Sequence, residues 1–87
     1  MKLIMDVNIV SKENVSALAR KEYDSNVIPY IGLEIEDSAW KNPKGIINVT
    51  VNYQEDYIYV LLEDYEVRDD KFDEEKKMLL GHGWTIH

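Results

Sequence analysis

The chain has 87 residues, which suffices for one small domain with a single core, and no linker or repeat divides residues 1–87. It contains no cysteine, so disulfides and thiolate metal sites are excluded. Its net charge of −7 disfavours direct binding to nucleic acid or to an anionic membrane, because phosphates attract Lys and Arg. No apolar run approaches the ~20 residues that span a bilayer, and Asp6 and Asn8 interrupt the apolar N-terminus that a signal peptide would need. We therefore expect a cytoplasmic protein.

The first quarter of the chain predicts a strand followed by a helix. Apolar and polar residues alternate from Leu3 to Ile9, which is the period of a half-buried strand. Ser11 is a suitable N-cap for a helix over residues 12–23. The apolar residues at helical spacing on one face of this segment are Val15, Leu18, Ala19 and Tyr23. Turn-forming residues at 24–26 end the predicted helix.

The middle of the chain predicts three strands. Residues 27–36 are β-branched and aromatic, and Pro29 among them indicates an edge strand or an irregular start. Residues 47–53 alternate as a strand does, and a short loop at residues 54–56 returns the chain along residues 57–62. The apolar face of the first of these two strands consists of Ile47, Val49, Val51 and Tyr53. The two strands are predicted to form an antiparallel hairpin.

The last part of the chain predicts a second helix. It begins at Asp69 or Asp70, carries its acidic residues near the start, and has Gly81 as the residue after its end. Residues 84–86 could form a short final strand. The resulting order is β-α-β-β-β-α-β. It predicts an α+β domain, with a mostly antiparallel sheet of three to five strands and two helices against one face.

Negative charge is concentrated in residues 54–75, which hold ten carboxylates and two cations. The rest of the chain has seven acids and eight bases, so the whole net charge comes from this segment. Like charges repel and cost stability, so the segment is either tolerated as a solvated face or used to bind a basic partner. The candidate partner-binding residues are Glu63, Asp64, Glu66, Asp69, Asp70, Asp73, Glu74 and Glu75. The residues that could extend this surface are Glu34, Glu36 and Asp37.

Carboxylates on a strand can imitate a row of phosphates. Alternate residues of a strand lie roughly 6.6–6.8 Å apart, close to twice the ~3.4 Å rise between phosphates of one DNA strand. A protein that binds DNA through Lys and Arg would accept such a surface and release counterions in the same way. Tyr57, Tyr59 and Tyr65 lie in or beside the acidic segment. They either pack within the sheet or supply the binding face with aromatic contacts.

The sequence contains no pattern of metal-binding or catalytic residues. The EF-hand spacing is absent, and His82 and His87 have no cysteine or nearby carboxylate. No serine has the context of a nucleophile elbow, and the glycines form no phosphate-binding loop. We therefore expect no metal, no cofactor and no enzymatic activity.

Through its size, its lack of cysteine and the carboxylates of residues 63–75, the chain resembles small acidic phage-encoded DNA mimics. Among them it is similar to inhibitors of the histone-like HU proteins. The resemblance covers the C-terminal half and lies in the display of charge, because these proteins share no sequence motif. It implies a non-catalytic inhibitor in the host bacterial cytoplasm that blocks the nucleic-acid-binding site of a basic, nucleoid-associated protein. Anti-CRISPR proteins and nuclease-inhibiting antitoxins or immunity proteins follow the same physical logic.

The alternative function is a protein–protein interaction module, either an accessory subunit or a homodimer. It would bind through the apolar sheet edge predicted at residues 27–35, with Ile28, Ile31 and Leu33 in the interface. The two functions differ in their response to salt, which weakens contacts made by charge and leaves apolar contacts largely intact.

Overall fold

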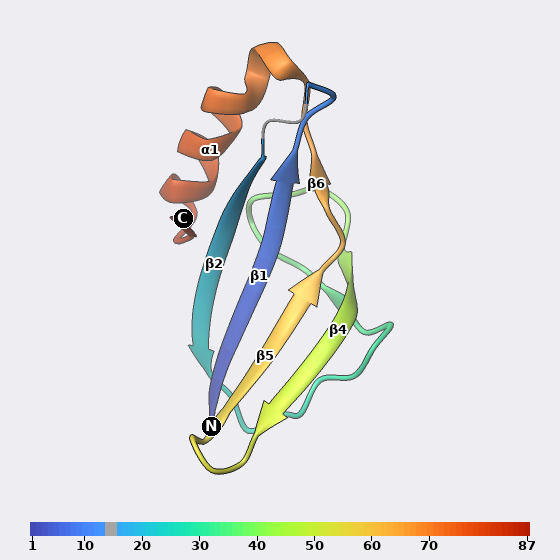
Figure 1. Cartoon of the computed structure of the whole chain (residues 1–87), viewed down its shortest axis with the longest axis vertical. Coiled ribbons are helices and arrows are strands. Elements are labelled where there is room, and N and C mark those ends of the chain that lie inside the picture. Colours follow the sequence, from blue (N-terminus) through green and yellow to red (C-terminus); the bar gives the residue numbers. More distant parts are fainter. Residues whose placement is uncertain (14–15) are drawn as a thin grey trace.

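The computed structural model describes residues 1–13 and 16–87 and measures 41 × 22 × 22 Å along its principal axes. Its strands form one sheet that curls into a half-barrel, and the helix α1 packs against this sheet (Figure 1). The strands are β1 (Lys2–Val10), β2 (Ser16–Asp24), β3 (Glu34–Ile35), β4 (Lys44–Asn52), β5 (Tyr57–Leu62), β6 (Tyr65–Glu66) and β7 (Thr85–Ile86). The helices are the 3-10 helix η1 (Asp69–Lys71) and α1 (Phe72–Gly81). No helix among these described residues is long and apolar enough to cross a membrane.

The strand β1 lies inside the sheet, whose order is β3-β4-β5-β1-β2-β7 with β6 also beside β1. β2 runs antiparallel to β1, whereas β5 and β6 both run parallel to it. The pairing shifts by one residue between β5 and β6, because Asp6 is opposite Leu61 whereas Ile9 is opposite Tyr65. The extra residue is accommodated at residues 63–64, where the chain leaves β5 and enters β6.

The helix predicted over residues 12–23 is wrong. Residues 16–24 form β2, and Val15 lies outside the described residues. The segment is rich in Ala, Leu, Arg, Lys and Glu, whose helix propensity is high. Strand pairing overrides that preference, because β2 pairs with β1 along its whole length and Ala19 is fully buried opposite Val7.

The predicted fold class is corrected accordingly. The described residues form a mainly β fold with one short α-helix, in place of an α+β domain with two helices. The sheet has seven strands and includes parallel pairs, where the sequence predicts three to five mostly antiparallel strands. A parallel pair of distant segments leaves no mark in local periodicity, which is why the prediction misses it.

The strand predicted at residues 27–36 is also wrong for most of its length, since within this described range only Glu34–Ile35 forms a strand, which pairs with β4. β2 and β3 lie on opposite sides of β1, so the segment that joins them must cross from one side of the sheet to the other. Residues 25–33 make this crossing as a loop, in which Pro29 is buried. Gly32 has a φ of +94° there, a left-handed conformation that favours glycine.

Other predicted elements are confirmed as β1, the β4–β5 hairpin, α1 and β7. One detail of β4 differs from its predicted alternation. A bulge between Ile46 and Asn48 turns Ile46 into the core and leaves Ile47 exposed, although the alternation places Ile47 on the apolar face.

The core lies on one face of the sheet. Its main residues are Met5, Val7 and Ile9 of β1, Ile58, Val60 and Leu62 of β5, Phe72 and Leu79 of α1, and Trp84. Ala39 and Trp40, in the loop between β3 and β4, also pack into this core. The alternate residues of β5 are Tyr57, Tyr59 and Leu61, which point to the opposite face and are half-buried.

The helix α1 ends in a Schellman motif in which Gly83, and not the predicted Gly81, takes the left-handed position. The N–H of Gly83 donates to the carbonyl of Leu80 at 3.3 Å, and the N–H of Trp84 donates to that of Leu79 at 3.1 Å. Gly83 has a φ of +92°. Trp84 and Leu79 are both buried, which is the apolar pair that accompanies this motif.

Candidate functional site

Seven carboxylates lie along the chain from the end of β5 to the first turn of α1, and all seven residues are exposed. We call this surface the acidic edge, and its residues are Glu63, Asp64, Glu66, Asp69, Asp70, Asp73 and Glu74. Figure 1 shows the path of this segment, which continues from β5 through β6 to the upper end of the molecule and turns there into α1. The structure therefore keeps seven of the eight main candidate residues on one exposed segment.

Three of these carboxylates are partly neutralised by neighbouring cations. The pairs are Arg68–Asp70 at 3.1 Å, Lys71–Glu74 at 3.4 Å and Lys76–Asp73 at 3.5 Å. They are largely exposed to solvent, so each contributes little and can exchange partners. In the described part of the chain, Glu63, Asp64, Glu66 and Asp69 form no ion pair with a cation. The least compensated charge therefore lies between the end of β5 and η1.

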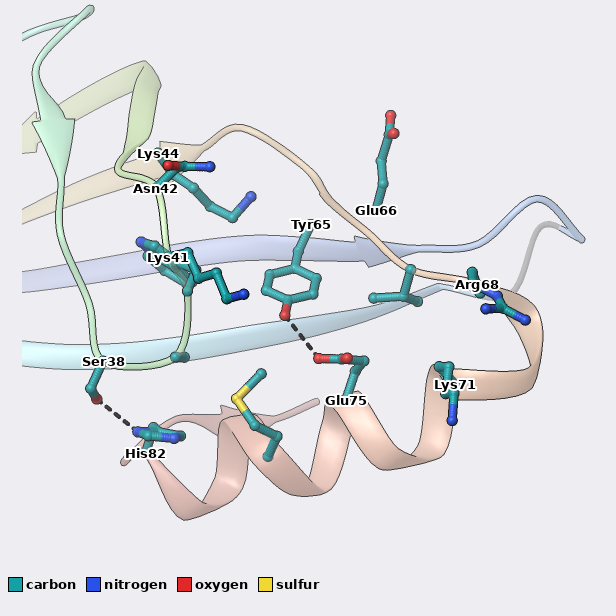
Figure 2. Close-up of a pocket in the computed structure, with 14 residues that line it drawn as sticks. Ser38, Lys41, Asn42, Lys44, Tyr65, Glu66, Arg68, Lys71, Glu75 and His82 are labelled. Atoms are coloured by element: carbon teal, nitrogen blue, oxygen red, sulfur yellow. Dashed lines mark hydrogen bonds between the residues drawn. The ribbon is translucent and has the colours of Figure 1, made fainter.

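Glu75, the eighth candidate, is half-buried and bonded to Tyr65. The hydroxyl of Tyr65 donates a hydrogen bond of 2.8 Å to Oε2 of Glu75 (Figure 2). Burial and this carboxylate together raise the pKa of Tyr65 to about 12. The pair thus joins β6 to α1, and both residues differ from the acidic edge in being turned inward.

The three candidate tyrosines do not share a face. Tyr57 and Tyr59 lie on the sheet face opposite to the core, whereas Tyr65 faces α1. Burial and the neighbouring Asp6 raise the pKa of Tyr59 above its ordinary value. The tyrosines therefore do not form one aromatic patch beside the acidic edge.

Among the residues that could extend the acidic surface, Glu34 and Glu36 are exposed but Asp37 is not. Only 3% of the Asp37 side chain is accessible to solvent. Its carboxylate accepts hydrogen bonds from Nζ of Lys21 at 2.8 Å and from the indole Nε1 of Trp84 at 3.2 Å. Asp37 therefore ties the loop after β3 to β2 and to the C-terminal segment.

An open groove with a volume of about 790 Å³ lies between residues 38–44, which lead into β4, and the elements β6 and α1 (Figure 2). We call it the basic groove, because the charged residues that line it are the cations Lys41, Lys44, Arg68 and Lys71 and the acids Glu66 and Glu75. The sequence does not predict this groove, because its cations come from segments that only the fold brings together. The one local signal is the placement of Lys41 and Lys44 on either side of the Asn42-Pro43 pair.

Ser38 and His82 meet at one end of the groove, where Oγ of Ser38 lies 2.7 Å from Nδ1 of His82. Nucleophilic catalysis needs such a contact together with a group that orients the imidazole and donors for the oxyanion. In the described residues no carboxylate bonds to His82, and both side chains are exposed, so the contact corresponds to a surface hydrogen bond. Residues 1–13 and 16–87 contain no group of three or more His, Asp or Glu side chains that could hold a metal ion.

No protein-family model, curated protein or solved structure matches this chain. The residues of the chain itself are therefore the basis for assigning its function. Three surfaces of the described chain bear on that function: the acidic edge, the basic groove and the loop at residues 27–31.

Proposed function

We propose that the protein is a non-catalytic inhibitor that binds a basic DNA-binding protein and blocks its nucleic-acid-binding site. The observation that carries this proposal is the exposure of all seven carboxylates of the acidic edge on one continuous segment. A partner that neutralises DNA phosphates with Lys and Arg can make similar contacts to these carboxylates. The resemblance to inhibitors of histone-like HU proteins makes a nucleoid-associated protein of that kind, in a bacterial cytoplasm, the favoured partner.

The backbone that carries the least compensated charge supports this proposal, because it is held by hydrogen bonds to the sheet. Glu66 pairs with Val10 of β1, and the N–H of Glu63 donates to the carbonyl of Gly45 at 3.0 Å. The N–H of Val67 donates to the carbonyl of Val10 at 2.9 Å. Charges on such a preorganised segment lose less conformational entropy on binding than charges on a flexible acidic tail.

A competition measurement tests the proposal. An HU-type protein is bound to fluorescent duplex DNA, and this chain is added at several salt concentrations. We expect displacement of the DNA at low salt and a steep loss of displacement as salt rises, because the contacts are between charges. Displacement that does not respond to salt would contradict a charge-based interface. Absence of displacement at every salt concentration would exclude HU-type proteins as the partner.

A pair of matched variants locates the interface. Asp64→Asn with Glu66→Gln removes two charges from the acidic edge and should weaken displacement about tenfold. Glu55→Gln with Asp56→Asn removes two charges from the turn between β4 and β5, at the opposite end of the molecule (Figure 1), and should leave displacement unchanged. Equal weakening by the two variants would show a dependence on net charge alone and would refute the assignment to the acidic edge.

A second function, interaction with another protein through apolar contacts, is favoured by the loop that replaces the predicted sheet edge. Its exposed apolar residues, each with the fraction of its surface that solvent reaches, are Val27 (67%), Ile28 (54%), Tyr30 (64%) and Ile31 (66%). Four such residues within five positions form the kind of apolar patch that marks an interaction site. Leu33, which the sequence places in the same interface, is half-buried against the core. A partner held here should remain bound at high salt and be lost with Ile28→Ser and Ile31→Ser.

A further inference from the structure

The basic groove gathers positive charge in a chain that is acidic overall. Four of the ten Lys and Arg residues line it, against two of the seventeen Asp and Glu residues. We propose that this groove binds a small organic phosphate, that is, a phosphate ester with an aromatic or apolar carbon body. The groove adjoins the acidic edge and shares Glu66 with it. The proposal is nevertheless independent of the inhibitor function, because cations and not carboxylates would hold its ligand.

Lys44 is held at the wall of the groove by two aromatic rings and a carbonyl group. Its Nζ lies 4.9 Å from the ring centroid of Tyr65 and 5.6 Å from that of Trp40. The same atom donates a hydrogen bond of 3.2 Å to the backbone carbonyl of Asp64. These contacts position the ammonium group without cancelling its charge by a carboxylate. An ammonium group has three donors, so a phosphate oxygen can be an additional acceptor.

Lys41 supplies a second positive charge on the same side of the groove. Lys41 is exposed, and Figure 2 shows its side chain, from the loop before β4, and that of Lys44, at the start of β4, extending toward Tyr65. Neither lysine forms an ion pair with any carboxylate of the described residues. Two unpaired lysines that flank one cavity in so acidic a chain are suited to a ligand with a compact negative charge.

Arg68 and Lys71 extend the positive charge toward the start of α1. Both are engaged in the exposed pairs of the acidic edge, with Asp70 and Glu74. Because such exposed pairs contribute little, these cations add to the attraction of an anion without being its main contacts. The decisive residues for the ligand are therefore Lys41 and Lys44.

The remaining lining favours an ester over inorganic phosphate. The ring of Tyr65 and the side chains of Val67 and Met78 give the groove an apolar part that can contact a carbon body. Glu66 points away from the groove in Figure 2. Glu75 faces it, with Oε2 bonded to Tyr65, so its negative charge opposes an anionic ligand.

Titration of the ¹⁵N-labelled full chain with phenyl phosphate, followed through the amide chemical shifts, tests the proposal. The expected result is a saturable shift of the amides of residues 38–42, 44 and 65–68, with weaker binding of inorganic phosphate and no binding of phenol. Lys41→Ala should weaken phenyl phosphate binding about tenfold, since it removes a charged contact. Lys77→Ala removes the same charge from an exposed position of α1 outside the groove and should have no effect.

The variant Glu75→Gln should raise the affinity for phenyl phosphate, whereas Lys41→Ala should lower it. Glu75→Gln keeps an acceptor for the hydroxyl of Tyr65 but removes the negative charge, so phenyl phosphate should bind more tightly. Shifts that do not saturate, or equal effects of Lys41→Ala and Lys77→Ala, would overturn the proposal, because both results describe unspecific attraction. Equal affinity for phenol would overturn it as well, by making the groove a site for apolar ligands. Lys41 is exposed, and the amide spectrum of each variant reports directly whether its fold is intact.

Discussion

The guanidinium of Arg20 holds the buried carboxylate of Asp6 by two hydrogen bonds of 2.8 Å, from Nε to Oδ1 and from Nη2 to Oδ2. The two residues lie directly opposite each other on β2 and β1. Asp6 is fully buried although it lies on the sheet face opposite to the core, where Arg20 bonds to it and Tyr59 lies beside it. The hydrogen bond to Asp6 also raises the pKa of Arg20 above its ordinary value.

Removal of Arg20 should destabilise the fold strongly. Arg20→Ala leaves the carboxylate of Asp6 buried without its cation, which we expect to cost about 3 kcal/mol of the free energy of unfolding. Lys2→Ala breaks the exposed pair of Lys2 and Glu22 between the same two strands and should cost less than about 1 kcal/mol. Urea unfolding followed by tryptophan fluorescence measures both values. Equal costs would show that the buried pair has no special role.

The two glycines at the end of α1 should respond to alanine with opposite signs. Gly83 has a φ of +92°, and an added Cβ would lie 3.3 Å from Cε of Lys21, so Gly83→Ala should cost about 1–2 kcal/mol. Gly81 is the last residue of α1, and an added Cβ meets no described atom within 4 Å. Gly81→Ala should therefore stabilise the protein by up to about 1 kcal/mol. Urea midpoints that move in the same direction for both variants would contradict the assignment of the Schellman glycine.

Acid should destabilise the protein through Asp37. Burial disfavours the charged carboxylate, but hydrogen bonds from Lys21, from the N–H of Ala39 and from the indole of Trp84 outweigh burial and hold the pKa of Asp37 below its ordinary value. A carboxylate whose pKa is lowered in the folded state stabilises the fold above its unfolded pKa of about 4. That contribution is lost as the pH falls through the folded-state pKa.

Thermal unfolding between neutral pH and about pH 2 measures this effect of Asp37. Asp37→Asn should lower the Tm at neutral pH and make the Tm less dependent on pH below about pH 4. Glu36→Gln, at the neighbouring exposed position, is the matched control and should leave the acid profile unchanged. If Glu36→Gln changed the dependence of the Tm on pH as much as Asp37→Asn, the loss of stability in acid would not be due to the buried pair of Asp37 and Lys21.

Tyr65 should ionise at a higher pH than an ordinary tyrosine. Burial and the carboxylate of Glu75 raise its pKa to about 12. Since the pKa is raised in the folded state, the neutral phenol stabilises the fold below its unfolded pKa of about 10, and this contribution is lost as the pH rises through about 12. Titration of phenolate absorbance should show a late step that is absent in Tyr65→Phe and moves to lower pH in Glu75→Gln. A late step that survives in Tyr65→Phe belongs to another residue.

The parts of the fold that could be predicted are those encoded locally. β1 and the β4–β5 hairpin follow from alternation along the chain, and α1 follows from charge placement and apolar spacing. β2 could not be predicted in this way, because its residues favour a helix and only the long pairing with β1 makes them a strand. The loop at residues 25–33 has strand-like composition, but the order of the strands requires it to cross the sheet.

In the candidate site, too, some features follow from the local sequence and others depend on the fold. Glu63, Asp64 and Glu66 are exposed as the charge pattern predicts. The inward orientation of Asp37 and of Glu75 could not be predicted, since each is decided by a hydrogen-bonding partner that the fold supplies. The basic groove could not be predicted either, because three segments distant in the sequence must come together to form it.

The parallel pairing of β1 has a consequence for the order in which the chain can fold. Lys2 lies opposite Tyr57 and Val10 lies opposite Glu66, so one edge of β1 is completed only after residues 57–66 have been synthesised. As the chain leaves the ribosome, β1 and β2 can pair early, and the free N–H and C=O groups on the other edge of β1 then remain open to other chains. Contacts so distant in sequence also form slowly. A chain that ends before Tyr57, whether nascent or prematurely terminated, therefore has an unpaired strand edge that can pair with other chains. We expect its solubility to depend on how soon residues 57–66 are synthesised.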